Sequence, residues 1–141
     1  MAVSGIGTKW SAWAPQLLSL LRIVAAFMFI QPGTMKLFGW PMAMPGGGTV
    51  PLLSQMGIGG AMEIVGGGLL LLGLFTRPVA FILSGEMACA YFMGHMFKDA
   101  AKPVFLPLLN GGTGAILFCF ACLYLSTAGG GPYSVDEMRK K

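Results

Sequence analysis

The stretch FILSGEMACAYFMGHMF, residues 81–97, places one carboxylate, Glu86, and one histidine, His95, in an otherwise apolar run. A charged side chain inside hydrocarbon costs about 3 kcal/mol or more, so it turns inward and pairs with another group. Glu86 therefore requires a cation from a neighbouring element, and it is a candidate for titration or ligand contact. Three further ionisable residues lie in comparable apolar surroundings: Arg22, Lys36 and Glu63.

Helix geometry predicts two ion pairs among these four residues. Arg22 and Lys36 are 14 residues apart, so they lie within about 40° of each other on one helix face. Depths taken at about 1.5 Å per residue bring Arg22 to Glu86 near one membrane surface and Lys36 to Glu63 near the other. The pairs have two interpretations, both left open: they only fix helix register, or one carboxylate titrates or contacts a substrate headgroup.

The remaining reactive side chains are three cysteines and one histidine. Cys119 and Cys122 form a C-F-A-C motif, and Cys89 falls at a similar depth. A CxxC pair is a redox motif in polar surroundings, whereas these thiols lie in apolar runs, which favours packing. His95 is nine residues from Glu86, about half a turn away around the helix, so it is expected near the membrane surface. The sequence has no metal-ligand spacing and no phosphate-binding loop.

The composition requires a membrane for the elements that carry these groups. Of the 141 residues 55% are hydrophobic and only 10% are charged, against about 25% charged in a soluble domain. Four runs approach the roughly 20 apolar residues of a spanning helix. We therefore predict an all-α, four-helix transmembrane bundle forming one domain over 1–141, with spans at about 17–38, 58–75, 79–97 and 108–127.

The connections and their charges predict an orientation. In the GLFTRP turn, Thr76 is a helix-capping type and Pro78 suits a first helical turn. Four spans place this turn and both termini on one side. The basic residues of that side are Lys9, Arg22, Arg77, Arg139, Lys140 and Lys141, and those of the other side are Lys36, Lys98 and Lys102. The excess predicts that both termini lie in the cytoplasm, and no basic cluster suits nucleic acid.

Several segments of the chain resemble the DoxX family of small bacterial membrane proteins. They are LLRIVAAFMFIQPGTMKLFG, EIVGGGLLLLGLFTRPVA, AYFMGHMF and NGGTGAILFCFACLYLSTAGGGPYSVDE, which ends in a P-Y-S-x-D motif. The resemblance runs from about Leu17 to Asp136 and implies a four-helix bundle in a bacterial inner membrane. The polar positions of the family matched here are Lys36, Glu63, Arg77 and Asn110. Pro32 stands where relatives often carry a histidine.

The resemblance also implies a link to quinone-coupled oxidoreductases, because a relative is the small subunit of such an enzyme. Candidate contacts for a quinone or headgroup are then Lys36, Glu63, His95 and Asn110. The chain carries no haem ligand pair, flavin motif or iron–sulfur cysteine set of its own, so we expect no cofactor bound by this chain alone. Two alternatives stay open: a non-catalytic assembly subunit of a larger membrane complex, and a small-solute or proton pathway. All three readings imply the lipid bilayer as a partner. The oxidoreductase subunit and the assembly subunit also imply further membrane subunits.

Overall fold

The computed structural model describes residues 4–141, and every regular element within them is helical. The predicted all-α class is therefore confirmed. In chain order the elements are α1 (Ser4–Ser11), α2 (Ala14–Phe38), α3 (Gln55–Leu72), α4 (Thr76–Cys89), η1 (Ala90–Met96), α5 (Pro107–Asn110), α6 (Thr113–Ala128) and α7 (Val135–Met138). η1 is a π-helical continuation of α4.

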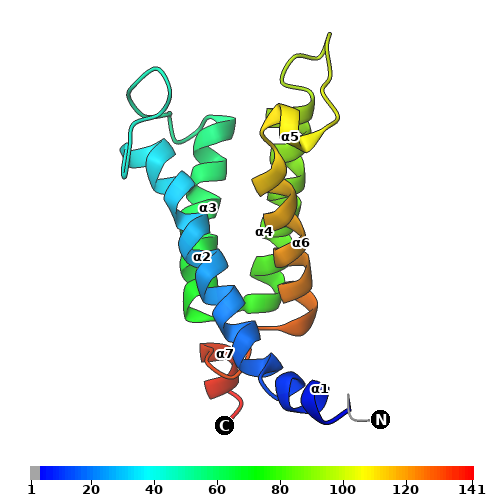
Figure 1. The fold of residues 1–141 in the computed structure, drawn as a ribbon. Coiled ribbons are helices and arrows are strands. Elements are labelled where there is room, and N and C mark those ends of the chain that lie inside the picture. The colour runs from blue at the N-terminus through cyan, green and yellow to red at the C-terminus, as the bar shows by residue number, and fades with distance from the viewer. Residues whose placement is uncertain (1–3) are drawn as a thin grey trace.

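Four of these segments form the membrane bundle. Three are long and apolar enough to cross a bilayer: Ala14–Phe38, Gln55–Leu72 and Thr76–Met96. The fourth, Thr113–Ala128, is apolar but has only 16 residues, about 24 Å of helix against a hydrocarbon core of about 30 Å. The short α5 stands at its N-terminal end (Figure 1). The architecture is the expected four-helix bundle.

Local backbone geometry shifts the helix boundaries from the predicted ones. The second span begins at Gln55 rather than residue 58, because the Ser54 hydroxyl caps it by accepting the Gly57 N–H at 3.0 Å. It ends at Leu72, since Gly73 adopts a left-handed conformation with φ +69°. The fourth span begins at Thr113 rather than residue 108, because Gly111, with φ +74°, separates it from α5.

The bundle consists of two helix pairs. α2 packs along α3, and α4 packs along α6, while α3 and α4 join the pairs. Both termini and the α3–α4 turn lie at one end, which we call the terminal end; the loops 39–54 and 97–112 lie at the other, the loop end (Figure 1). The pairs lie together at the terminal end and separate toward the loop end.

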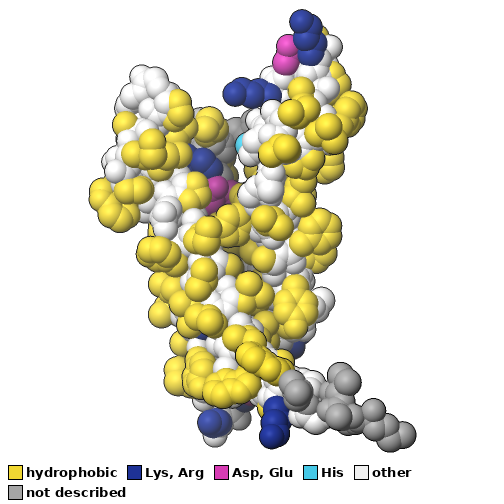
Figure 2. Space-filling model, in the orientation of Figure 1, with side chains coloured by type: hydrophobic (Ala, Val, Ile, Leu, Met, Phe, Trp, Pro, Cys, Tyr) yellow, Lys and Arg dark blue, Asp and Glu magenta, His cyan; other side chains and the backbone are white. Residues whose placement is uncertain are grey.

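A small apolar core holds the pairs together, and most other large apolar side chains face outward. Phe29, Leu70, Leu83 and Leu125 are at most 2% exposed, and the Phe29 ring meets Phe118 edge-on with centroids 5.3 Å apart. Apolar side chains cover the outer surface along the bundle (Figure 2). They include Phe27, Val65, Phe81, Leu117 and Phe120, each at least 60% exposed. This distribution fits a lipid surrounding.

Glycines allow α2 and α3 to approach closely within one pair, and α3 and α4 to approach closely where the two pairs meet. A Cβ at Gly33 of α2 would lie 2.7 Å from the Gly60 carbonyl oxygen of α3. A Cβ at Gly66 of α3 would lie 2.8 Å from the Leu83 side chain of α4. Helix association in a membrane depends on such backbone proximity, because hydrocarbon supplies no hydrophobic driving force between helices.

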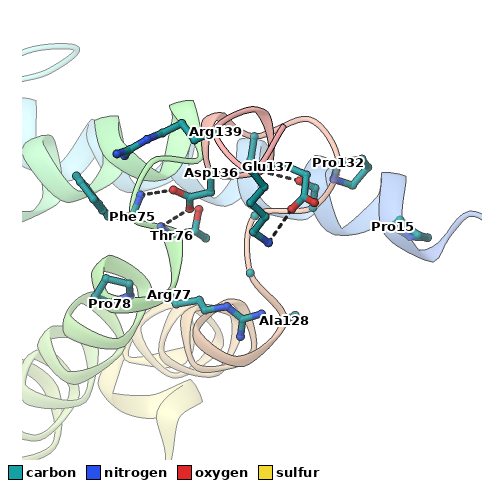
Figure 3. A pocket seen from close by; sticks show the side chains of 15 residues that line it. Pro15, Phe75, Thr76, Arg77, Pro78, Ala128, Pro132, Asp136, Glu137 and Arg139 are labelled. Atoms are coloured by element: carbon teal, nitrogen blue, oxygen red, sulfur yellow. Dashed lines mark hydrogen bonds and ion pairs between the residues drawn. The ribbon is translucent and has the colours of Figure 1, made fainter.

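The C-terminal segment closes the terminal end through Asp136. Its Oδ1 accepts the Phe75 N–H and its Oδ2 accepts the Thr76 N–H, both at 2.8 Å (Figure 3). The Thr76 side chain, expected as the cap of this helix, does not cap it, because Thr76 is already the first helical residue. Asp136, 60 residues further along the chain, therefore supplies the cap that the local sequence lacks.

These contacts set the protonation behaviour of Asp136. Partial burial alone would raise the pKa of the carboxyl group, but the hydrogen bonds from the backbone of Thr76 and of Phe75 lower the pKa more, and the net shift is downward. A carboxylate with a lowered pKa in the folded state contributes stability above its ordinary pKa of about 4. That contribution disappears as the pH falls through the folded-state pKa.

Replacing Gly33 by alanine should loosen the α2–α3 pair. We expect Gly33→Ala to lower the free energy of unfolding by about 1–3 kcal/mol, because the added methyl group would clash with the Gly60 carbonyl oxygen. The matched control is Gly68→Ala in α3, where a Cβ meets nothing within 4 Å; it should be neutral or stabilise by up to about 1 kcal/mol. Circular dichroism during titration of mixed micelles with sodium dodecyl sulfate measures both. Equal effects at the two glycines would contradict the packing argument.

Asp136→Asn should destabilise the protein in a pH-dependent way. The amide keeps one accepting oxygen, so one N–H at the start of α4 loses its acceptor and the charge near the helix terminus disappears. We expect a loss of about 1–2 kcal/mol at pH 7. The gap to the wild type should shrink as the pH falls below about 4, since the Asp136 carboxyl group then protonates in the unfolded chain, where its pKa is not lowered.

The same micelle titration at pH 7 and at pH 3 measures this prediction. Glu137→Gln is the control, because the one interaction of the Glu137 side chain with the described residues is an exposed ion pair with Lys140 at 3.0 Å, and such pairs contribute about 1 kcal/mol or less. A gap between wild type and Asp136→Asn that is the same at both pH values is incompatible with the capping role.

Candidate functional site

Lys36 of α2 and Glu63 of α3 form a buried ion pair near the loop end. The Lys36 Nζ lies 2.7 Å from Glu63 Oε1 and 2.9 Å from Oε2. Glu63 is 2% exposed, whereas the Lys36 side chain is 18% exposed. Gly60 makes room for the lysine, because a Cβ at this position would lie 3.3 Å from the Lys36 Cβ. The structure thus brings together the two residues that the sequence pairs at this end.

Glu86 of α4 stands next to this pair with an unoccupied hydrogen-bonding position. A Cβ at Gly59 of α3 would lie 3.2 Å from Glu86 Oε1, so the carboxylate faces the α3 backbone. Its Oε2 is buried and has no hydrogen-bond partner among the described residues. The charges of Glu63 and Lys36 both act on it. Buried polar groups are otherwise almost always satisfied, so this oxygen can accept a hydrogen bond from a ligand.

The site lies where the two helix pairs separate. Its three charged residues come from both pairs: Lys36 and Glu63 from α2 and α3, and Glu86 from α4. Figure 2 shows the surface hollowed between the pairs toward the loop end, with charged side chains of both signs in the hollow. A molecule that enters between the pairs therefore meets one donor, the Lys36 ammonium group, which Glu63 already shares, and one free acceptor, Glu86 Oε2.

The second predicted pair, Arg22 with Glu86, is wrong. Arg22 lies at the terminal end, where its Nη2 donates to the Tyr133 carbonyl oxygen at 2.7 Å and a Cβ on Gly73 would overlap its Nη1. Glu86 is ten residues into α4, about 15 Å from that end. The prediction counted both depths from helix starts that it took as level, whereas Arg22, eight residues into α2, lies against Gly73, just before α4 begins.

A loop that the sequence left unassigned holds Arg22 in place. The Ser19 hydroxyl donates to the Gly130 carbonyl oxygen at 3.1 Å and accepts the Tyr133 N–H at 3.1 Å. The segment 130–134 is thereby fixed against α2 beside the 1% exposed Arg22. Ser19, Tyr133 and Asp136 are the structural residues that the sequence reasoning missed. The closing P-Y-S-x-D motif marks two of them without revealing their contacts.

His95 and Asn110, predicted as headgroup contacts, lie together but on the other helix pair. The His95 Nδ1 is 3.1 Å from the Asn110 backbone oxygen. The Asn110 side chain donates to the Val104 carbonyl at 2.8 Å and accepts the Gly112 N–H at 2.7 Å. These bonds organise the turn before α6. Tyr91 supports the same turn through a 2.8 Å bond from its hydroxyl to the Phe105 carbonyl oxygen.

The three cysteines occur as free thiols in different surroundings. Cys122 is completely buried in the core, Cys119 is half-buried and Cys89 is exposed on the bundle surface. The Ser84 hydroxyl donates to the Cys119 carbonyl oxygen at 2.8 Å, which ties α4 to α6. Among residues 4–141 there is no group of three His, Cys, Asp or Glu side chains suited to a metal ion.

Substitutions of Lys36 and Glu63 should destabilise the protein by unequal amounts, and their effects should be strongly coupled. Removing one partner of a buried pair costs about 3–5 kcal/mol because the other charge is left alone. We expect Lys36→Met to destabilise more than Glu63→Met, because Lys36→Met leaves two carboxylates, whereas Glu63→Met leaves Lys36 with Glu86 nearby. The double variant should be milder than the sum of the two singles.

Unfolding in mixed micelles measures the four members of this cycle. The exposed Lys140–Glu137 pair, with side chains 69% and 46% exposed, provides the control cycle, for which we expect a coupling of about 1 kcal/mol or less. Additive effects at Lys36 and Glu63, or a larger loss for Glu63→Met, would refute the arrangement described above.

Comparison with known proteins identifies the family. The DoxX family model matches residues 17–96, more than half of the chain. An uncharacterized protein of Haemophilus influenzae is 45% identical over 125 residues, which cover 89% of this chain and 92% of that protein. The inner membrane protein YphA of Escherichia coli is 28% identical over 137 residues, covering 91% and 94%. No solved structure matches the chain. Together with the helical membrane architecture, these matches show that the chain is an integral membrane protein belonging to the DoxX family.

Proposed function

We propose that this protein is the membrane subunit of a quinone-linked oxidoreductase and that the Lys36–Glu63–Glu86 cluster binds the headgroup of the quinone or quinol. The observation that carries the proposal is the buried Glu86 Oε2, which has no partner within the described residues. It stands beside a lysine that is 18% exposed. A quinol hydroxyl donates one hydrogen bond, and a quinone carbonyl accepts one, so a headgroup complements these two groups.

The role of each residue follows from its contacts. Glu86 accepts the hydrogen bond of the headgroup and is placed to take up its proton, because no described side chain competes for Oε2. Lys36 donates to the other oxygen with the part of its ammonium group that Glu63 leaves free. Glu63 holds Lys36 in position. Quinol oxidation releases two electrons and two protons; the electrons pass to a redox centre carried by another subunit.

We further propose a bacterial inner membrane location with both termini in the cytoplasm. The name of YphA places that relative in the inner membrane. Within this chain the terminal end carries more basic residues than the loop end, and cytoplasmic segments are enriched in Lys and Arg. The cluster then lies nearer the outer surface of the membrane.

One alternative is a non-catalytic subunit that assembles a larger membrane complex. A specific observation favours it: the Asn110 side chain and the His95 Nδ1, from two of the four predicted headgroup contacts, are used within their own turn. A proton or solute pathway has less support. The core that separates the two polar ends consists of side chains such as Phe29, Leu70 and Leu83.

Glu86→Gln tests the proposed function. The protein is purified in mild detergent, the co-extracted quinone is quantified from its absorption, and a short-tailed quinol is titrated by its effect on tryptophan fluorescence. We expect bound quinone in the wild type and a loss of about ten-fold or more in quinol affinity in Glu86→Gln, because a hydrogen bond to a charged group contributes about 1.5–3 kcal/mol. Glu137→Gln at the terminal end is the control and should bind normally.

Two results would decide against the proposal. Equal quinol affinity in wild type and Glu86→Gln would show that the cluster does not bind the quinol headgroup. Stable co-purification of other membrane proteins without quinone would favour the assembly alternative.

A further inference from the structure

An apolar groove runs between α3 and α4. It has a volume of about 420 Å³, within the range of about 300–1,000 Å³ that ligand sites occupy. Its walls come from residues 58–69 of α3 and 79–83 of α4, and the loop 39–54 adds Leu52 and Leu53. Every residue that lines it is Leu, Ile, Val, Met, Ala or Gly. The groove therefore complements an apolar chain, and its wall on α3 is about 16 Å long.

The groove opens to the lipid and has a tightly packed floor. Ile58, Val65 and Ile82 line it and are 51%, 63% and 56% exposed. The floor is the contact between the two helices, where a Cβ at Gly66 would lie 2.8 Å from the 1% exposed Leu83. A chain lying in the groove would contact both helices, and an unfilled groove would forfeit those dispersion contacts.

The line of closest approach between α3 and α4 leads from this floor to Glu86. Gly59 is seven residues before Gly66, about two turns along the same face of α3, and Glu86 is three residues after Leu83. A Cβ at Gly59 would lie 3.2 Å from Glu86 Oε1. Ile58, which precedes Gly59, lines the groove. The Glu86 carboxylate therefore lies at the edge of the groove, in its half nearer the loop end.

We propose that this groove binds the isoprenoid tail of the quinone or quinol whose headgroup the Lys36–Glu63–Glu86 cluster holds, so that the substrate class is the tailed quinones of the membrane. The inference rests on the proposed function. Ligand sites combine apolar walls with a few polar groups that orient the ligand. Here the polar groups lie toward the loop end, and the apolar wall extends from there toward the terminal end. A headgroup at Glu86 thus directs its tail into the hydrocarbon interior.

The tail should contribute through fit and not through burial as such. The surrounding lipid is as apolar as the groove, so leaving it supplies no hydrophobic driving force. Dispersion contacts with two packed helices remain as the favourable contribution, and they depend on the shape of the groove. A side chain that narrows the groove should therefore weaken the binding of a tailed quinol and leave a tailless quinol unaffected.

Quinol binding to the full chain in lipid nanodiscs tests the groove. The probes are a tailless benzoquinol and the same benzoquinol with a geranyl tail, titrated by tryptophan fluorescence. Affinities are referred to the quinol concentration in the lipid phase, which removes differences in partitioning. We expect the wild type to bind the tailed probe more tightly. Val65→Phe, halfway along the groove, should weaken binding of the tailed probe about five-fold and leave that of the tailless probe unchanged.

The matched control is Val24→Phe, the same substitution at a 47% exposed position of α2 outside the groove. It should leave both affinities unchanged. Unchanged binding of the tailed probe in Val65→Phe would overturn the proposal and leave the groove to acyl chains of the bilayer or to a helix of another subunit. Equal losses for the two probes, or equal losses in the two variants, would overturn it as well. Failure of the proposed function gives a different result, because the tailless probe then does not bind the wild type.

Discussion

The buried ion pair between Lys36 and Glu63 is the interaction on which the loop end of the bundle depends. An ionised carboxylate that is 2% exposed within a membrane segment is tolerated only with a cation at hydrogen-bonding distance, and Lys36 contacts both of its oxygens. That contact in turn requires α2 and α3 to approach closely. Gly33 and Gly60 permit the approach, since a side chain at Gly33 would meet the backbone of α3. The ion pair therefore depends on the close packing of α2 against α3 that the two glycines permit.

The two ends of the bundle solve the problem of buried polar groups differently. At the terminal end, the C-terminal segment supplies backbone and carboxylate partners: the Tyr133 carbonyl oxygen for the Nη2 of Arg22, and Asp136 for the start of α4. At the loop end, no segment folds over the helix pairs in this way, and they separate (Figure 1). The terminal end is thus stabilised by long-range hydrogen bonds, whereas the loop end leaves its charged cluster beside open space between the pairs.

The sequence predicts those features that depend on composition and on local helix geometry. The all-α class and the four apolar runs follow from hydropathy, because a spanning helix must satisfy its backbone internally. The Lys36–Glu63 ion pair is also predictable from the sequence, because α2 and α3 are consecutive helices and both residues lie near the same end of the bundle. The Arg22–Glu86 pair failed because the depth estimate took the starts of α2 and α4 as level, whereas Arg22, eight residues into α2, lies against Gly73, just before α4 begins. The cap of α4 comes from Asp136, 60 residues away, and no local pattern reveals that contact.

Glu86 connects the energetic argument with the functional one. A second carboxylate beside Glu63 adds repulsion and desolvation cost without forming an ion pair of its own. A neutral side chain in the same place would avoid both costs, so Glu86 is not explained by stability. Strained or unsatisfied groups are expected where a protein binds or transforms something, because folding alone gives no reason to keep them. The other buried side-chain polar atoms without a partner among the described residues lie at the closed terminal end, on Gln16, Arg22 and Thr76, whereas Glu86 Oε2 lies on the side where the helix pairs separate. A ligand that donates a hydrogen bond there would supply the partner that the fold does not.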